Sequence, residues 1–221
     1  MTLATQITLT ATPLSAYFYA LGVLHGGRGP RVIGGPVDVA MLGFGVGGLV
    51  AFGPFGQTVL GRVAGADLGP WHWGAWSALV GMWVLVFAGA ASRRLAVYNV
   101  TADELDRAVR EALAQLGGHF APTLGGFEDP RRGWGVAVKP VRWLRAGSVE
   151  AYGGDAEALI VELKPWLRST LGRVPRRPSA LSPAMFGLAG LAMLVPVVVF
   201  FAGHPRAKES LRAFLQSLRW W

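Results

Sequence analysis

The chain has 221 residues, of which 52% are hydrophobic and only 15% are charged, whereas soluble domains usually carry about 25% charged residues. The absence of cysteine excludes disulfides, thiolate metal sites and a cysteine nucleophile. A net charge of +8 would suggest nucleic acid in a soluble protein, but in a membrane protein it indicates contact with anionic lipid and arginine-rich segments on the cytoplasmic side.

Three stretches without a charged residue are long enough to cross a lipid bilayer as helices: 39–60, 73–91 and 182–202. A hydrocarbon core about 30 Å thick requires about 20 apolar helical residues. The sequence therefore predicts an integral membrane α-helical bundle with three transmembrane helices and a small α+β domain inserted between the second and the third. On this basis we divide the chain into 1–36, 37–94, 95–178, 179–203 and 204–221.

The first segment is predicted to hold a strand, a short membrane-associated helix and a basic loop. Apolar and polar residues alternate over 5–12, as in a strand, and Pro13 is typical of the first position of a helix. A helix over 13–25 would rise only about 20 Å, which favours an interfacial or half-inserted helix. The alternative is a helix that extends back to residue 2 and forms a fourth span. The basic loop is predicted over 28–36.

The two-helix hairpin 37–94 is predicted to pack through small side chains. Residues three or four apart share one face of a helix, and small residues there let membrane helices approach closely. Pro54 lies between glycines and should kink the outer half of the first helix. The predicted packing residues are Ala40, Gly43, Gly47 and Ala51 in the first helix and Gly74, Ala78 and Gly81 in the second.

Residues 95–178 have the composition of a soluble domain, because charges recur and the apolar runs become short. A predicted strand over 95–100 is followed by Thr101 and Glu104, whose spacing is that of a capping box at the start of a helix. Gly117 is typical of the residue that follows a helix end.

The second half of this domain is predicted as strands followed by one helix. Asp155 is expected to cap that helix, and Pro165 to break or kink it. Helices on one face of an antiparallel sheet form a small α+β sandwich, for which a ferredoxin-like arrangement is the nearest common shape. Strands are predicted over 119–124, 133–141 and 148–152, and a polar turn over 128–133.

The last two segments are predicted to be the third transmembrane helix, 179–203, and a basic tail, 204–221. A basic, proline-rich linker precedes the helix. The tail places leucines and a phenylalanine on one helical face and ends in two tryptophans. This composition is typical of an amphipathic helix that lies in the membrane interface.

Basic residues near the ends of spans stay on the cytoplasmic side of a membrane. Arginines precede the first span, follow the second and precede the third, which predicts that 28–36 and the α+β domain lie in the cytoplasm. The basic tail would then lie on the opposite side, against the rule. Because no basic residue comes before Arg28, a signal peptide is not predicted and Met1 is expected to remain. We expect a multi-pass protein of the bacterial inner membrane.

The sequence predicts no catalytic residue, no cofactor and no metal site. His25, His72 and His204 lie at predicted membrane boundaries, where ordinary interface residues are favoured over metal ligands. Asp38 is the acid beside a span; a carboxylate that stabilises the positive end of a helix is favoured over a functional acid. The glycines of 43–48 lack the preceding strand and the lysine of a phosphate loop.

Basic and aromatic residues of the α+β domain form its most suggestive surface. Such residues bind single-stranded nucleic acid by charge and stacking, and they also bind anionic lipid. Because the domain is joined to predicted spans at both ends, lipid or a protein partner is favoured over nucleic acid as the ligand of this surface. An ordinary solvated surface, with Trp134 in the core, is favoured over any ligand. The candidate contact residues are Arg131, Arg132, Trp134, Arg142, Trp143 and Arg145, with Arg212, Trp220 and Trp221 in the tail.

Together these features predict a small membrane protein, for which a non-enzymatic role is favoured over an enzymatic one. Its expected role is that of an accessory, scaffold or assembly subunit that acts through contacts with lipid, with other membrane proteins or with itself. One alternative is a component of a small transport or channel assembly. The second is a membrane-anchored enzyme with its site in the α+β domain.

Overall fold

The computed structural model describes residues 3–27, 29–53, 56, 71–174 and 179–203, and these belong to two compact units. Each long helix contributes residues to both units. The helical unit is made from the described parts of Met1–Tyr19, Phe44–Gly81 and Phe186–Trp221, and the sheet unit from those of Ala20–Gly43 and Met82–Met185.

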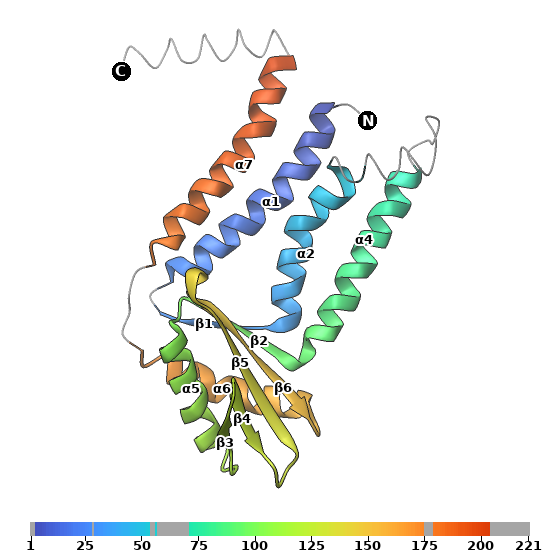
Figure 1. Ribbon diagram of the computed structural model, residues 1–221. Coiled ribbons are helices and arrows are strands. Elements are labelled where there is room, and N and C mark those ends of the chain that lie inside the picture. Colours follow the sequence, from blue (N-terminus) through green and yellow to red (C-terminus); the bar gives the residue numbers. More distant parts are fainter. Residues whose placement is uncertain (1–2, 28, 54–55, 57–70, 175–178, 204–221) are drawn as a thin grey trace. The chain divides into compact units, whose positions relative to one another are not determined.

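Four helices among the described residues are long and apolar enough to cross a membrane, with mean hydropathies between 1.4 and 2.4. Lipid favours helices because a helix satisfies its backbone hydrogen bonds internally. Three of the four correspond to the predicted spans, and the kink expected at Pro54 lies outside the described residues. The helices are α1 (Leu3–Gly26), α2 (Gly35–Phe52), α4 (Trp71–Ala90) and α7 (Leu181–Gly203), shown in Figure 1.

The structure of α1 corrects the prediction for the N-terminal segment. The strand expected over 5–12 and the short helix expected over 13–25 form one helix, in agreement with the alternative of a helix that reaches back toward residue 2. A threonine hydroxyl can bond to the carbonyl one turn earlier, so the alternation of threonines with apolar residues does not exclude a helix. Pro13 lies inside α1, where its ring packs closely against Gly48 of α2.

Within the helical unit, the helices contact one another in the order α7, α1, α2, α4 (Figure 1). The hydroxyl of Ser15 in α1 donates a hydrogen bond of 2.8 Å to the carbonyl of Ala189 in α7. Gly45 of α2 lies against Tyr17 of α1, so closely that a Cβ would collide with it. The indole N–H of Trp76 in α4 donates a bond of 3.2 Å to a carbonyl of α2.

The sheet unit contains a six-stranded antiparallel sheet with the order β1-β2-β6-β5-β4-β3. Long-range pairing at one edge joins Val32 of β1 to Val97 of β2. The strands are β1 (Arg31–Gly34), β2 (Arg94–Tyr98), β3 (Ala121–Thr123), β4 (Gly126–Asp129), β5 (Trp134–Val141) and β6 (Ala146–Gly153).

Two strands were not predicted. The loop expected over 28–36 contains β1 and the first residues of α2, and the turn expected over 128–133 begins inside β4. Both strands have four residues, which is too few for an alternating pattern to be recognised. The strands predicted over 95–100, 133–141 and 148–152 correspond to β2, β5 and β6.

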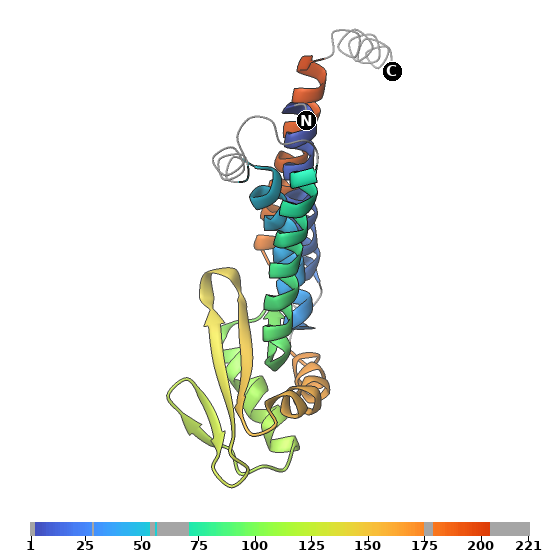
Figure 2. The same ribbon diagram turned by 90° about the vertical axis from the view of Figure 1, so that its right-hand side faces the viewer.

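Two helices, α5 (Ala102–Gln115) and α6 (Ala156–Leu171), pack on one face of this sheet and bury the core (Figure 2). The predicted capping box of Thr101 and Glu104 is confirmed, and the Asp155 carboxylate caps α6 by accepting a bond of 3.1 Å from the N–H of Ala158. The break predicted at Pro165 is wrong: α6 continues through this exposed proline to Leu171.

The ferredoxin-like expectation agrees with the structure only in part. The order β2, α5, β5, β6, α6 places β6 between β2 and β5, as in a split β-α-β arrangement. However, α6 leads toward α7 instead of a last strand, and the place beside β2 is taken by β1, which comes earlier in the chain. An additional hairpin, β3–β4, extends the other edge. The segment between α1 and α2 therefore completes the sheet.

Candidate functional site

Asp38 lies at the start of α2, where it joins that helix to the first strand after α4. Its carboxylate Oδ2 lies 3.1 Å from Nη2 of Arg94, and Oδ1 accepts a short hydrogen bond from the hydroxyl of Tyr98. The side chain of Asp38 is 15% exposed and that of Arg94 38%. A position in the first helical turn also places the carboxylate near the positive end of the helix. Asp38 thus has two side-chain partners besides the helix end that we expected.

His25 lies beside this ion pair, in the last turn of α1. Its side chain is buried and its ring meets that of Tyr98 edge to face, with 5.5 Å between the centroids. Next to it, Nδ2 of Asn99 donates a bond of 3.4 Å to the carbonyl of Gly27. These contacts fix the end of α1 to the end of β2.

Asn99 and Arg145 have left-handed backbone conformations, with φ of 58° and 46°. Non-glycine residues seldom adopt positive φ, and their occurrence together marks a position that surrounding contacts hold in place. The carbonyl of Arg145 accepts a bond of 2.9 Å from the N–H of Val100, so the two lie side by side. We refer to His25, Asp38, Arg94, Tyr98, Asn99 and Arg145 as the junction cluster.

The junction cluster has the chemistry of a structural connection. Its one carboxylate is already bound by a guanidinium and a phenol, and its described side chains include no thiol, amine or aliphatic hydroxyl that could act as a nucleophile. The sequence analysis named Asp38, His25 and Arg145, each for a separate reason, and did not relate them to one another. The six members come from separate parts of the chain, and only their arrangement in space brings them together.

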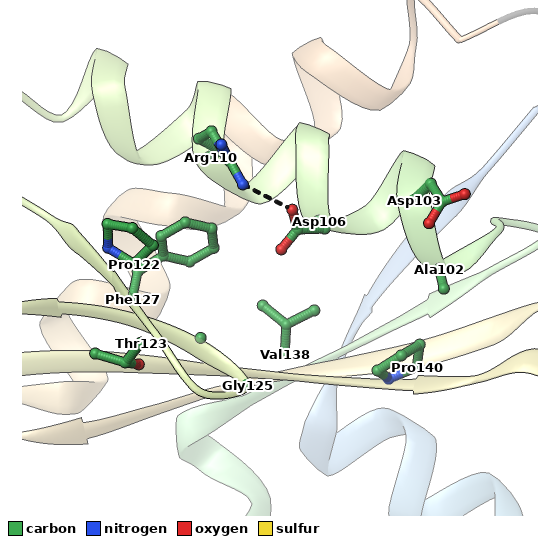
Figure 3. A pocket seen from close by; sticks show the side chains of 11 residues that line it. Ala102, Asp103, Asp106, Arg110, Pro122, Thr123, Gly125, Phe127, Val138 and Pro140 are labelled. Carbon is green, nitrogen blue, oxygen red and sulfur yellow. Dashed lines mark hydrogen bonds and ion pairs between the residues drawn. The ribbon is translucent and has the colours of Figure 1, made fainter.

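A hollow of about 320 Å³ lies between α5 and the strands β4 and β5 (Figure 3). Asp106 and Arg110 form an exposed ion pair of 3.1 Å on α5, and the guanidinium lies over the ring of Phe127. Figure 3 shows Asp103 turned away from this pair. Acid–base catalysis requires two groups that converge on one reacting atom, and this hollow does not provide them.

The six basic and aromatic candidates of the domain fall into two groups at opposite ends of the β5–β6 hairpin. Strand β5 has eight residues, so its ends are about 23 Å apart. Trp134 packs against the core, as the solvated-face interpretation expected, with the guanidinium of Arg132 5.1 Å from its ring centroid. Arg131 is adjacent, while Arg142, Trp143 and Arg145 lie at the other end.

The turn beside Trp134 is built around Asp129. Its carboxylate is buried and accepts hydrogen bonds from the backbone N–H groups of His119, Arg131 and Arg132, at 3.1, 3.0 and 3.4 Å. Burial raises the pKa of this carboxyl, but the three N–H donors and the nearby Arg132 charge outweigh it, and the pKa lies below the usual 3.8. The described contribution of Arg131 to this turn is thus the hydrogen bond that its backbone N–H donates to Asp129.

The low pKa of Asp129 predicts a pH-dependent contribution to stability. The ionised carboxylate stabilises the fold above pH 3.8, and this contribution is lost as the pH falls through the lower pKa of the folded state. Asp129→Asn should therefore unfold at a lower temperature than the unmodified chain at pH 7. The difference should shrink at acid pH, as followed by thermal unfolding monitored with circular dichroism. A difference that is independent of pH would contradict this assignment.

The predicted packing residues divide between the two helices. In α2, Gly43 lies against Val84 and Gly47 is within 3.5 Å of Val80, measured from an added Cβ. Ala51 is buried and Ala40 is exposed. On α4, by contrast, Gly74, Ala78 and Gly81 are all exposed, and no described atom lies within 4 Å of a Cβ added at either glycine.

The sequence analysis missed a second face of α2. Gly45 and Gly48 are buried against α1, at the same spacing of three residues that identified the first face. The candidates Arg212, Trp220 and Trp221 lie outside the described residues. Among the described residues there is no group of histidine, aspartate and glutamate side chains that could hold a metal ion. No known protein family, curated protein or solved structure matches this chain.

Proposed function

We propose that the protein is a membrane-embedded accessory, scaffold or assembly subunit without catalytic activity. It holds an α+β domain at the surface of the bacterial inner membrane, on the cytoplasmic side, and binds another membrane protein or a second copy of itself. The observation that carries this proposal is the small-residue face of α4, which meets no other part of the described chain.

The contrast between α2 and α4 supports a partner for that face. The glycines of α2 are in contact with neighbouring helices, as the general rule for small residues in membrane helices requires. The face of α4 with Gly74, Ala78 and Gly81 has the same composition and spacing but open space before it. A face that contacts only lipid does not need small residues, because large apolar side chains suit lipid equally well. Close approach of a helix from another protein therefore explains the small residues of α4 better.

The attachment of the domain also supports a scaffold. Strand β1 comes from the segment between α1 and α2, and the junction cluster joins α1, α2 and the hairpin β5–β6 to β2. The domain therefore has several separate connections to the ends of candidate spans. Such a domain is suited to holding a bound protein at a defined place near the membrane.

A substitution on α4 tests the proposal. Gly81→Leu should leave the fold intact, because space is open around Gly81, and should remove a larger complex that co-purifies with the chain in mild detergent. Gly190→Leu on α7 is the matched control, since space is also open there. Blue-native electrophoresis of both variants gives the result.

Two outcomes would contradict this function. A chain that migrates alone in every mild detergent, with or without Gly81→Leu, has no stable membrane partner. Equal loss of the complex in Gly190→Leu would show that the effect does not depend on the α4 face. Conductance in planar bilayers by the purified chain would favour the channel alternative instead.

A further inference from the structure

We propose that the tip of the β5–β6 hairpin, residues 141–145, is a lipid-binding loop that places Trp143 in the headgroup layer of an anionic membrane. This inference rests on the membrane location proposed above and adds the surface by which the α+β domain itself contacts lipid. Under this proposal the residues at the tip contact lipid, whereas the residues around Trp134 stabilise the fold.

The tip exposes apolar side chains that the turn does not require. The side chain of Trp143 is 76% exposed and that of Val141 is 36% exposed. The turn is closed by backbone, with the N–H of Arg145 bonded at 3.2 Å to the carbonyl of Arg142. A polar residue at position 143 would form the same turn. Tryptophan has an apolar body and a polar N–H, and it prefers the boundary between lipid and water.

The position of the tip within the sheet unit is that of a membrane boundary. The carbonyl of Arg145 is bonded to Val100, and the preceding Asn99 is bonded to Gly27, directly after the candidate span that ends at Gly26. In Figures 1 and 2 the tip lies level with the ends of α1 and α7 that belong to this unit. A bilayer whose boundary lies at these ends of α1 and α7 would meet the tip at headgroup depth.

The charge around the tip is complementary to anionic lipid. Arg142 in the tip and Arg31 in β1 are both exposed, and neither forms an ion pair with another described residue. The contact of Arg31 with Gly27 places it at the same end of the sheet. Basic residues close to an anionic lipid surface strengthen binding to that surface.

The other hairpin of the domain provides a control that separates position from exposure. Leu124, in the turn between β3 and β4, is fully exposed and apolar, but this turn lies beside the middle of β5, where the carbonyl of Gly125 accepts a bond of 2.8 Å from the N–H of Val138. If exposure alone determined lipid contact, both tips would reach the membrane. The proposal requires that only the tip with Trp143 does so.

The absence of cysteine allows the test to be made with single-cysteine variants of the full chain. Trp143→Cys and Leu124→Cys are spin-labelled and reconstituted into phosphatidylcholine vesicles with and without phosphatidylglycerol. With phosphatidylglycerol, the label at 143 should collide several-fold less often with a water-soluble nickel reagent than the label at 124, and more often with oxygen. Combining Trp143→Cys with Arg142→Ala should reduce this protection.

Three results would overturn the proposal. The label at 143 could be as accessible to the nickel reagent as the label at 124. It could be protected both from the nickel reagent and from oxygen, which would mean that protein covers the tip. Protection could also be the same without phosphatidylglycerol, which would remove the role of the charge. A label at Leu85→Cys, on the exposed face of α4, tests the membrane location separately. If α4 does not lie in the membrane, this label is accessible to the nickel reagent too; if it does, only the proposal about the tip is overturned.

Discussion

Gly35→Ala is expected to lower the free energy of unfolding by about 3 kcal/mol, the upper part of the range for overpacking. A Cβ at this position would collide with the carbonyl oxygen of Ala91 and lie 2.7 Å from that of Arg94. Both are backbone atoms, at the place where the chain leaves α4 and enters β2, so they cannot move aside by a side-chain rotation. Thermal unfolding of the purified chain in mild detergent, followed by circular dichroism, measures the effect.

Gly29→Ala is the matched control for this prediction. Gly29 lies in the same segment between α1 and α2, and no described atom lies within 4 Å of a Cβ added there. It should change the unfolding temperature little, or raise it slightly by restricting the unfolded chain. Equal stability of the two variants would show that the close approach of α2 to β2 is absent from the folded protein.

The features that could be predicted from the sequence are local. The capping box of Thr101 and Glu104 depends on residues three positions apart, and so does the cap of Asp155 on Ala158. The strand β5 is long enough for its alternation to be recognised. In each case the residues that decide the structure are neighbours in the chain.

The features that could not be predicted depend on residues far apart in the chain. Strand β1 has four residues between glycines and prolines and becomes a strand because β2, more than sixty positions later, offers a free edge. The same reason applies to His25 and Tyr98, whose contact no sequence spacing indicates. The helix start predicted at Pro13 is also wrong: α1 continues through this proline, whose ring packs closely against a distant residue, Gly48.

The candidate contact surface shows a further limit of pattern reasoning. Arg131, Arg132 and Trp134 are close in sequence to Arg142 and Trp143, so composition treats them as one basic and aromatic set. Because a strand extends its residues over about 3.3 Å each, eight strand residues separate the two groups completely. A strand prediction over 133–141 already contained this information, since it places one group at the start of the strand and the other after its end.

Asp38→Ala is expected to lower the free energy of unfolding by about 2 kcal/mol, less than a fully buried ion pair because the side chain of Arg94 is 38% exposed. The substitution removes the acceptor of both Arg94 and Tyr98. Nε of Arg94 is already buried without a hydrogen-bond partner among the described residues. Without the Asp38 carboxylate, the Arg94 guanidinium would also lose its ion pair. The starts of α2 and β2 should then separate more easily, and limited proteolysis should cleave the segment between α1 and α2 faster.

Two controls distinguish this role from the alternatives. Asp106→Ala removes an ion pair of the same 3.1 Å length between exposed partners on α5, and it should cost only about 0.5 kcal/mol. Asp38→Asn keeps an oxygen that accepts from Tyr98 and should fall between the two. If Asp38→Ala were no more destabilising than Asp106→Ala, the ion pair would not explain why a carboxylate lies at the start of this candidate span. A functional acid would then become the better hypothesis, because a carboxylate at that position that adds no stability requires another reason to be there.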